Sequence, residues 1–180
     1  VREIWISGAL HATDGYQKLL ELIRQKNITA TVVAAGAGIN LGELNGIALF
    51  PLDEKTGQLP DNQHDANIVT YWTYGTQSIL LTGDAEAEHE AAMLARDIVK
   101  PTTILKVGHH GSRTSTSAPF LNAVKPQFAV IQVGQNNRYG HPTTEVIERL
   151  SAVGAQILRT DQGGTILFGM TPTFTAQLSP

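Results

Sequence analysis

The sequence predicts an α/β layered sandwich formed by one domain. Short apolar runs that end in Gly alternate with amphipathic segments, which is the pattern of strands separated by helices. Two of these runs are followed directly by ionisable side chains, Asp84 after one and His109 with His110 after the other. A chain of 180 residues is long enough for one domain with a sizeable core and too short for two ordinary ones. No repeat, low-complexity tract or linker divides residues 1–180.

The first third of the chain contains three short runs that favour strands, at 1–6, 29–34 and 47–52. A helix is expected from a cap at Thr13 or Asp14 to about Lys26, and Asn27 suits the left-handed residue that ends it. The buried stripe of this helix is expected to contain Leu19, Leu20, Leu22 and Ile23. Residues 35–46 are rich in Gly and are expected to form a loop.

The remainder of the chain alternates strands and helices. Strands are expected at 67–74, 77–81, 103–107, 128–133, 155–159 and 165–168. The first two form a hairpin through Gly75 and Thr76. Helices are expected at 85–99, 118–124 and 143–153. Ser117 is a suitable cap for the second helix, and Pro126 ends it.

The composition excludes several classes of protein. With 42% hydrophobic and 16% charged residues the chain is globular. The net charge of -3 and the lack of a dense Lys/Arg run argue against a stand-alone nucleic-acid binder, which normally presents a basic patch. Cysteine is absent, so disulfides and thiolate metal sites are excluded. No apolar run approaches the roughly 18–20 residues that span a bilayer. No P-loop or Gly-x-Ser-x-Gly motif is present, and residues 1–180 are not expected to include a signal peptide.

Asp84 and the pair His109 and His110 predict a metal site. A strand, a helix and a second strand place these side chains at strand ends, where α/β proteins commonly build their sites. Asp supplies a hard oxygen ligand, and neutral imidazole is the commonest nitrogen ligand of zinc and similar ions. The alternative for Asp84 is a helix N-cap, with Glu86 and Glu88 in the first turn of the helix.

The two adjacent histidines are expected to have different roles. On an extended backbone their rings would point in opposite directions, so both cannot bind one ion without a bend, which Gly108 and Gly111 would permit. We assign His110 to the metal and His109, as a catalytic residue, to the substrate phosphate or the leaving group. The alternative is a pair of loop histidines.

Four further polar residues are candidates for contact with a phosphate. Lys106 is predicted to meet the phosphate as a second catalytic residue, and its alternative is a solvated strand residue. Ser112, Arg113 and Thr114 are predicted to bind substrate, because hydroxyl and guanidinium groups donate to phosphate oxygens. The alternative is an ordinary polar loop. His11, in a loop, and His89, on the polar face of a helix, are expected at the surface.

Several ordered motifs resemble the metallo-β-lactamase-fold domain at the C-terminal end of the bacterial DNA-uptake protein ComEC. They are Leu-Leu-Thr-Gly-Asp-Ala-Glu at 80–86, Leu-Lys-Val-Gly-His-His-Gly-Ser-Arg-Thr-Ser at 105–115, Asn-Asn-Arg-Tyr-Gly-His-Pro at 136–142 and Arg-Thr-Asp-Gln-Gly-Gly-Thr at 159–165. The resemblance spans most of the chain and implies a metallo-β-lactamase-like αββα sandwich with two divalent ions, Zn or Mn, bridged by Asp84.

The resemblance adds two histidines to the candidate metal ligands. His64 precedes the strand that leads to Asp84, where the superfamily often has a histidine ligand and ComEC-like domains tend to have Asn. His141 opens a helix after the strand 128–133, which matches the superfamily's last histidine ligand. The alternative for His141 is a turn residue beside Pro142.

The superfamily's signature cluster, of the His-x-His-x-Asp-His kind, does not occur in the sequence. We therefore expect the chain to be the later part of the domain, without its N-terminal strands, and by itself inactive and poorly loaded with metal. An apolar sheet face that is left uncovered would favour a homo-oligomer.

The resemblance also implies a function, which is metal-assisted hydrolysis of phosphodiesters in single-stranded DNA. In the competence family this would be a nuclease that acts on the strand that is not imported, attached to a parent integral membrane channel. The domain would belong to a protein of the bacterial cytoplasmic membrane and lie on its extracytoplasmic side. Alternatives are a small-molecule esterase or lactonase of the same fold, or a non-catalytic domain that docks DNA or a partner.

Overall fold

The computed structural model describes residues 1–169 and 175–178 and is built around a seven-stranded mixed sheet. Its strand order is β3-β4-β5-β6-β7-β8-β9. The strands are β3 (Gly38–Leu41), β4 (Leu44–Phe50), β5 (Val69–Tyr74), β6 (Gln77–Leu81), β7 (Ile104–Lys106), β8 (Phe128–Ile131) and β9 (Gln156–Arg159). Neighbours from β3 to β6 are antiparallel, and neighbours from β6 to β9 are parallel. The predicted α/β fold is confirmed.

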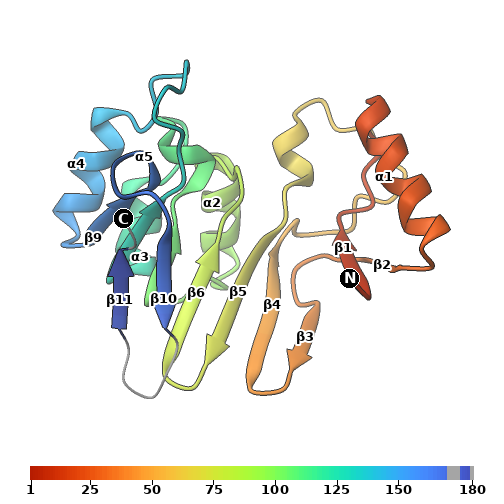
Figure 1. Cartoon of the computed structure of the whole chain (residues 1–180), viewed down its shortest axis with the longest axis horizontal. Helices are drawn as coiled ribbons and strands as arrows, with labels where there is room; N and C mark the ends of the chain where they lie inside the picture. The colour runs from red at the N-terminus through yellow and green to blue at the C-terminus, as the bar shows by residue number, and fades with distance from the viewer. Residues whose placement is uncertain (170–174, 179–180) are drawn as a thin grey trace.

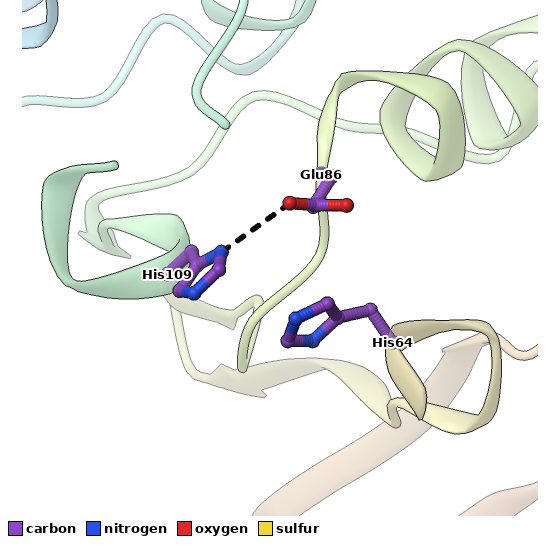
Figure 2. A group of neighbouring side chains, drawn as sticks. All are labelled: His64, Glu86 and His109. Carbon is purple, nitrogen blue, oxygen red and sulfur yellow. Dashed lines mark ion pairs between the residues drawn. The ribbon is translucent and has the colours of Figure 1, made fainter. Parts of the chain in front are cut away.

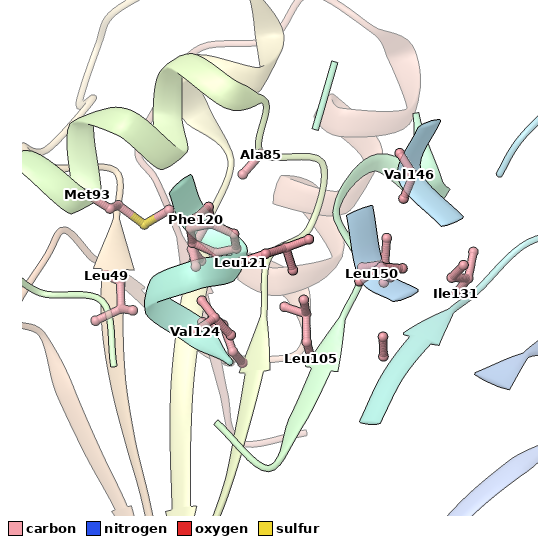
Figure 3. Close-up of a cluster of buried hydrophobic side chains, with 14 of the residues drawn as sticks. Leu49, Ala85, Met93, Leu105, Phe120, Leu121, Val124, Ile131, Val146 and Leu150 are labelled. Carbon is pink, nitrogen blue, oxygen red and sulfur yellow. The ribbon is translucent and has the colours of Figure 1, made fainter. Parts of the chain in front are cut away.

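Three helices cover one face of this sheet, and each links two parallel strands (Figure 1). They are α2 (Ala87–Ala95), α3 (Ala118–Val124) and α4 (Thr144–Ala152). The strands present a row of side chains towards them that includes Leu80, Leu105 and Ala129, all fully buried. Phe120 and Leu150 close this core from the helix side (Figure 3). Because burial contributes about 25 cal/mol per Å² of apolar surface, this layer anchors the strands whose ends carry the site.

The opposite face of the sheet carries a second, thinner layer of strands. It contains the parallel pair β1 (Glu3–Ile6) and β2 (Thr29–Val32), joined by α1 (Asp14–Gln25), and the antiparallel pair β10 (Ile166–Gly169) and β11 (Thr175–Leu178). Trp5 of β1 stacks on Trp72 of β5 with ring centroids 6.5 Å apart, and Phe168 meets Phe128 of β8 at 5.6 Å. Trp72 and Phe128 belong to one row of side chains on this face. The layers agree with the predicted sandwich (Figure 1).

Most predicted elements are present, and two details of the N-terminal third are wrong. The cap of α1 is Thr13, and Asn27 has a φ of 49°, as predicted. Residues 35–46 are not all loop, because β3 pairs with β4 around Gly42, at a φ of 67°. The stripe of α1 is narrower than predicted, since Leu19 and Leu22 are 41% and 45% exposed. The helix packs against a two-stranded sheet, which has little surface to cover it.

One edge of the large sheet gathers the ends of most strands. The carboxyl ends of β6, β7, β8 and β9 meet there because these strands are parallel, and the amino end of antiparallel β5 joins them. Loops at such an edge are the usual place for a site in an α/β protein. Within residues 1–169 and 175–178, no helix is long and apolar enough to cross a membrane.

Candidate metal centre

All four predicted metal ligands lie at this edge of the sheet. Asp84 follows β6, His110 follows β7, His141 lies in the segment between β8 and α4, and His64 lies in η1 (Gln63–Ala66), a 3-10 helix before β5. These positions come from four connections that are distant in the sequence. The sheet topology therefore brings the candidates together.

Asp84 is held by a turn that its neighbours fix from two sides. The Asn67 amide donates to the carbonyl of Thr82 at 2.8 Å, and its oxygen accepts from the backbone N–H of Asp84 at 3.2 Å. Gly83, at a φ of 55°, has no room for a Cβ, which would collide with the Asn67 side chain. Helix α2 begins at Ala87 with Glu86 as its N-cap, so the alternative of Asp84 as the cap is wrong.

Lys106 supports the same turn from β7. Its Nζ donates to the carbonyl oxygens of Gly83, at 3.1 Å, and of Val107, at 3.3 Å. Burial lowers the pKa of the Lys106 ammonium, while the charge of Asp84 opposes that shift. The side chain is half-buried rather than fully solvated, and its catalytic role stays a prediction.

The two adjacent histidines form a tight left-handed turn in η2 (Gly108–Gly111). His109 has a φ of 44° and His110 a φ of 55°, so the extended backbone considered from the sequence is not present. The bend lies in the histidines themselves, and His109 donates its backbone N–H to the carbonyl of Gly83 at 3.0 Å. Such residues are costly for side chains other than Gly and gather at functional sites. The turn directs the two rings to different neighbours.

His110 faces Asp84 with a ring nitrogen that can act as a hydrogen-bond acceptor or a metal ligand. Its Nδ1 lies 2.6 Å from the carbonyl oxygen of Gln132. Since a carbonyl only accepts, the neutral ring carries its proton on Nδ1, and Nε2 keeps its lone pair. Nε2 is 3.7 Å from Asp84 Oδ1. Two acceptors that face each other across this gap suit a shared cation, and a carbonyl on the other ring nitrogen is the usual support of a metal-binding histidine.

His109 lies with His64 and Glu86 in a second group of donors (Figure 2). Its Nδ1 is 3.5 Å from Glu86 Oε1, and its ring centroid is 4.7 Å from that of His64. One ligand atom from each of the three residues lies within 4.8 Å of the others. The residue assigned to the substrate thus lies among possible ligands, and the choice between His109 and His110 stays a prediction.

Two buried ring nitrogens at the site are unsatisfied. Nδ1 of His109 and Nδ1 of His141 have no hydrogen-bond partner among the residues that the structure describes, and their ring centroids are 6.0 Å apart. Burial lowers the pKa of His141, and the nearby His109 and His110 lower it further. Imidazole nitrogens without a hydrogen-bond partner, beside carboxylates, are a donor set that fits divalent metal ions.

Glu86 is one of the residues at the site that sequence reasoning missed. Thr114 donates its hydroxyl to Glu86 Oε1 at 2.8 Å. Burial raises the pKa of Glu86, but hydrogen bonds from Thr114 and Asn62, with His64 and His109 nearby, bring it below its ordinary value. Glu86 lies only two residues after Asp84, and this position could have indicated a role in the site. An acidic residue at the start of a helix is, however, commonly explained by its favourable interaction with the helix dipole.

His89, predicted at the surface, is buried and links two elements of the site. Only 4% of it is exposed. Its Nδ1 accepts the backbone N–H of Glu86 at 2.9 Å, so the neutral ring donates through Nε2 to Asp65 Oδ1, also at 2.9 Å. Asp65, Glu88 and His89 form another group of possible ligands. Because both ring nitrogens of His89 are occupied, we interpret it as a brace between η1 and α2.

The loop that follows the histidines is anchored by hydrogen bonds to buried groups, and two of its residues are exposed. Ser112 is buried and hydrogen-bonds Thr114 at 3.0 Å, while Arg113 and Thr114 are exposed. The buried Glu90 accepts the backbone N–H groups of Thr116 and Ser117. Phosphate binding by Ser112, Arg113 and Thr114 stays a prediction.

Comparison with known proteins shows that this chain is similar to part of several longer proteins. ComE operon protein 3 of Bacillus subtilis is 33% identical over 154 residues, which are 84% of this chain and 19% of that protein. Competence protein ComA of Neisseria gonorrhoeae is 40% identical over 99 residues, 53% of this chain and 14% of that protein. Recombination protein 2 of Haemophilus influenzae is 41% identical over 106 residues, 59% of this chain and 13% of that protein. The chain spans less than a fifth of each relative, and no family model matches it.

Two solved structures share the fold at low sequence identity. A putative metal-dependent hydrolase from Parabacteroides distasonis matches with a TM-score of 0.50 and 14% identity, over 88% of this chain and 64% of that one. CmlA, a diiron beta-hydroxylase from Streptomyces venezuelae, matches with a TM-score of 0.51 and 11% identity, over 77% of this chain and 34% of that one. At this level of identity the likeness concerns the fold alone.

Proposed function

We propose that this chain, which is a ComEC-related domain of the metallo-β-lactamase-like fold, contributes the catalytic centre of a metal-dependent phosphodiester hydrolase acting on single-stranded DNA. The observation that carries the proposal is the pairing of Asp84 with His110. The Gln132 carbonyl fixes the His110 ring so that Nε2 faces the carboxylate. The two groups lie 3.7 Å apart, with the carboxylate oxygen and the ring nitrogen both available to a shared cation.

Asp84 and His110 would hold the metal together with the surrounding donors, His64, Glu86, His109 and His141. Divalent ions, Zn or Mn, would there neutralise charge on the phosphoryl oxygens and make water a better nucleophile. Lys106 and Asn67 keep Asp84 in place. Arg113 and Thr114, exposed at the rim of the site, would orient the phosphate.

The relatives extend the proposal to the parent protein. We propose that the domain belongs to an integral membrane channel for DNA uptake, that it lies on the extracytoplasmic side, and that it degrades the strand that is not imported. The names of the relatives, which include one competence protein and one recombination protein, support this proposal.

The test is hydrolysis of a labelled single-stranded oligonucleotide by the parent protein, with Mn²⁺ or Zn²⁺ and with a chelator. We expect cleavage only with the metal. In Asp84→Asn the rate should fall more than the roughly 10–100-fold that outer-shell substitutions at metal sites cost. Asp97→Asn is the matched control, because Asp97 is exposed and its φ of 53° also suits Asn.

Two outcomes would contradict the proposal. If metal-dependent cleavage were unchanged in Asp84→Asn, Asp84 would not be a metal ligand of the catalytic centre. Hydrolysis of a lactone or a simple ester, with no action on DNA, would favour the small-molecule alternative.

A further inference from the structure

We propose that Tyr139 is a stacking platform for a nucleobase of the single strand, at a subsite beside the candidate metal centre. The inference rests on the proposed function and names how its substrate is held. Tyr139 is 78% exposed, the largest exposed fraction of an aromatic side chain in the described part of the chain. An exposed aromatic ring is commonplace by itself, so the argument depends on how this ring is held and what surrounds it.

An ordered turn holds Tyr139 away from the body of the protein. Asn137 donates its side-chain amide to the carbonyl oxygens of Gly134, at 3.2 Å, and His141, at 2.8 Å. The Asn137 oxygen accepts the backbone N–H of His141 at 3.0 Å. These bonds close the chain on both sides of Tyr139. The segment between β8 and α4, to which it belongs, rises at the top of the molecule (Figure 1). An ordered backbone on both sides of an aromatic residue lowers the entropy that is lost when its ring binds a flat ligand.

The ring is connected to the metal centre through His141. The rings of Tyr139 and His141 are stacked, with centroids 6.0 Å apart and an angle of 19° between their planes. Next to them lies a pocket of about 490 Å³ whose lining includes His110 and Gln132. Its size falls in the range of about 300–1,000 Å³ that is usual for small-ligand sites. A base in this pocket would therefore place its own phosphate close to His110 and Asp84.

The chemistry around the ring matches a nucleotide. Gln132 is exposed and lines the pocket, and a side-chain amide can hydrogen-bond to base edges. Arg138, exposed beside Tyr139, offers a cation for the phosphate backbone. An aromatic platform with a neighbouring cation is how proteins hold single strands with little preference for sequence. Because the chain has a net charge of -3, its overall charge does not attract DNA, and binding of a strand would depend on such local contacts.

The test measures binding without metal, so that it does not depend on catalysis. The full chain is titrated in EDTA against a fluorescein-labelled oligothymidylate and against a strand of equal length made of abasic units, and Kd is read from anisotropy. Tyr139→Ala should weaken binding of the oligothymidylate about 5- to 150-fold, which corresponds to about 1–3 kcal/mol per stacked base. Binding of the abasic strand should stay within twofold.

Two further variants separate stacking from other effects. Tyr139→Phe keeps the ring face and removes the hydroxyl, so its Kd should match the wild type. Tyr74→Ala, at the opposite end of β5 from the site, should not change either Kd. An unchanged Kd for the oligothymidylate in Tyr139→Ala, an equal loss for both strands, or no binding by the wild-type chain would overturn the inference. Absence of metal-dependent cleavage with this binding pattern intact would overturn the proposed function alone.

Discussion

Two histidines, His89 and His110, show how the partner of one ring nitrogen decides the role of the other. In His110 the Nδ1–H donates to the carbonyl of Gln132, and the free Nε2 faces Asp84. In His89 the backbone N–H of Glu86 occupies Nδ1, and Nε2 donates to Asp65. The first ring is therefore available to a metal ion and the second is not. Residue type alone does not make this distinction.

Glu90 should make stability depend on pH. It is 1% exposed, and burial raises its pKa above the ordinary value of 4.5, against hydrogen bonds from Ser117 and Thr116 and the charge of Arg149. The folded chain therefore holds this proton more tightly than the unfolded chain. Its contribution to the free energy of unfolding is greatest below pH 4.5 and falls as pH rises through the raised pKa.

In Glu90→Gln this part of the pH dependence should disappear. Urea denaturation from pH 4 to 8 should give a smaller fall in the free energy of unfolding with rising pH than in the wild type. Glu88→Gln, with a side chain that is 67% exposed, is the control and should keep the wild-type slope. Equal slopes in the wild type and Glu90→Gln would show that Glu90 does not titrate differently on folding.

The sequence identifies residues of the site when a strand end or a motif marks them. Asp84 and His110 follow buried strands, and His64 and His141 were added by resemblance. Glu86 and His89 were not found, because their roles depend on the contact between η1 and α2, which are more than 20 residues apart. A contact of this kind leaves no periodicity in either segment.

At the scale of elements, sequence patterns predicted correctly the features that depend on residues close together in the chain. The hairpin of β5 and β6 and the cap of α1 depend on a few neighbouring residues and are present as predicted. Strand β3 was missed because Gly38 and Gly42 conceal the alternation of Ile39 and Leu41. The left-handed turn at His109 was also missed, since side chains other than Gly rarely adopt it without support from the surrounding structure.

The turn at Gly83 should be more sensitive to substitution than other left-handed glycines. A Cβ at Gly83 would strike the Asn67 side chain that holds Asp84. At Gly57, with a φ of 73°, nothing lies within 4 Å of the added Cβ. Gly57→Ala should therefore cost only the backbone strain of about 1–2 kcal/mol, while Gly83→Ala should cost more and displace Asp84.

The comparison of these two variants needs two measurements. Urea denaturation gives the free energy of unfolding, and calorimetric titration with Mn²⁺ or Zn²⁺ gives metal affinity. We expect weaker metal binding in Gly83→Ala and wild-type binding in Gly57→Ala. If metal affinity were the same in both, the Asn67-supported turn would not position a ligand.

At the scale of the whole molecule, the two faces of the large sheet are covered unequally. Helices α2, α3 and α4 cover one face, where Leu80 and Leu105 are fully buried. On the other face the small sheets contact Trp72 and Phe128. Between these contacts lies a hollow of about 620 Å³ whose lining includes Ile39 and Leu81, and Leu81 is 39% exposed in the middle of the sheet. An apolar hollow of this kind on a sheet face commonly marks an interaction surface.

We expect two copies of the chain to associate through this hollow. A symmetric dimer would bury the same face of both copies, which removes apolar surface from water without a second type of partner. Light scattering over a range of micromolar concentrations should then give a mass that rises from one chain towards two. Leu81→Lys should keep the chain monomeric, because a charge in the centre of the interface would be desolvated. Leu22→Lys on α1, where the leucine is 45% exposed, should associate like the wild type. A wild-type chain that stays monomeric throughout, or an equal effect of both substitutions, would show that this face of the sheet does not bind a second copy.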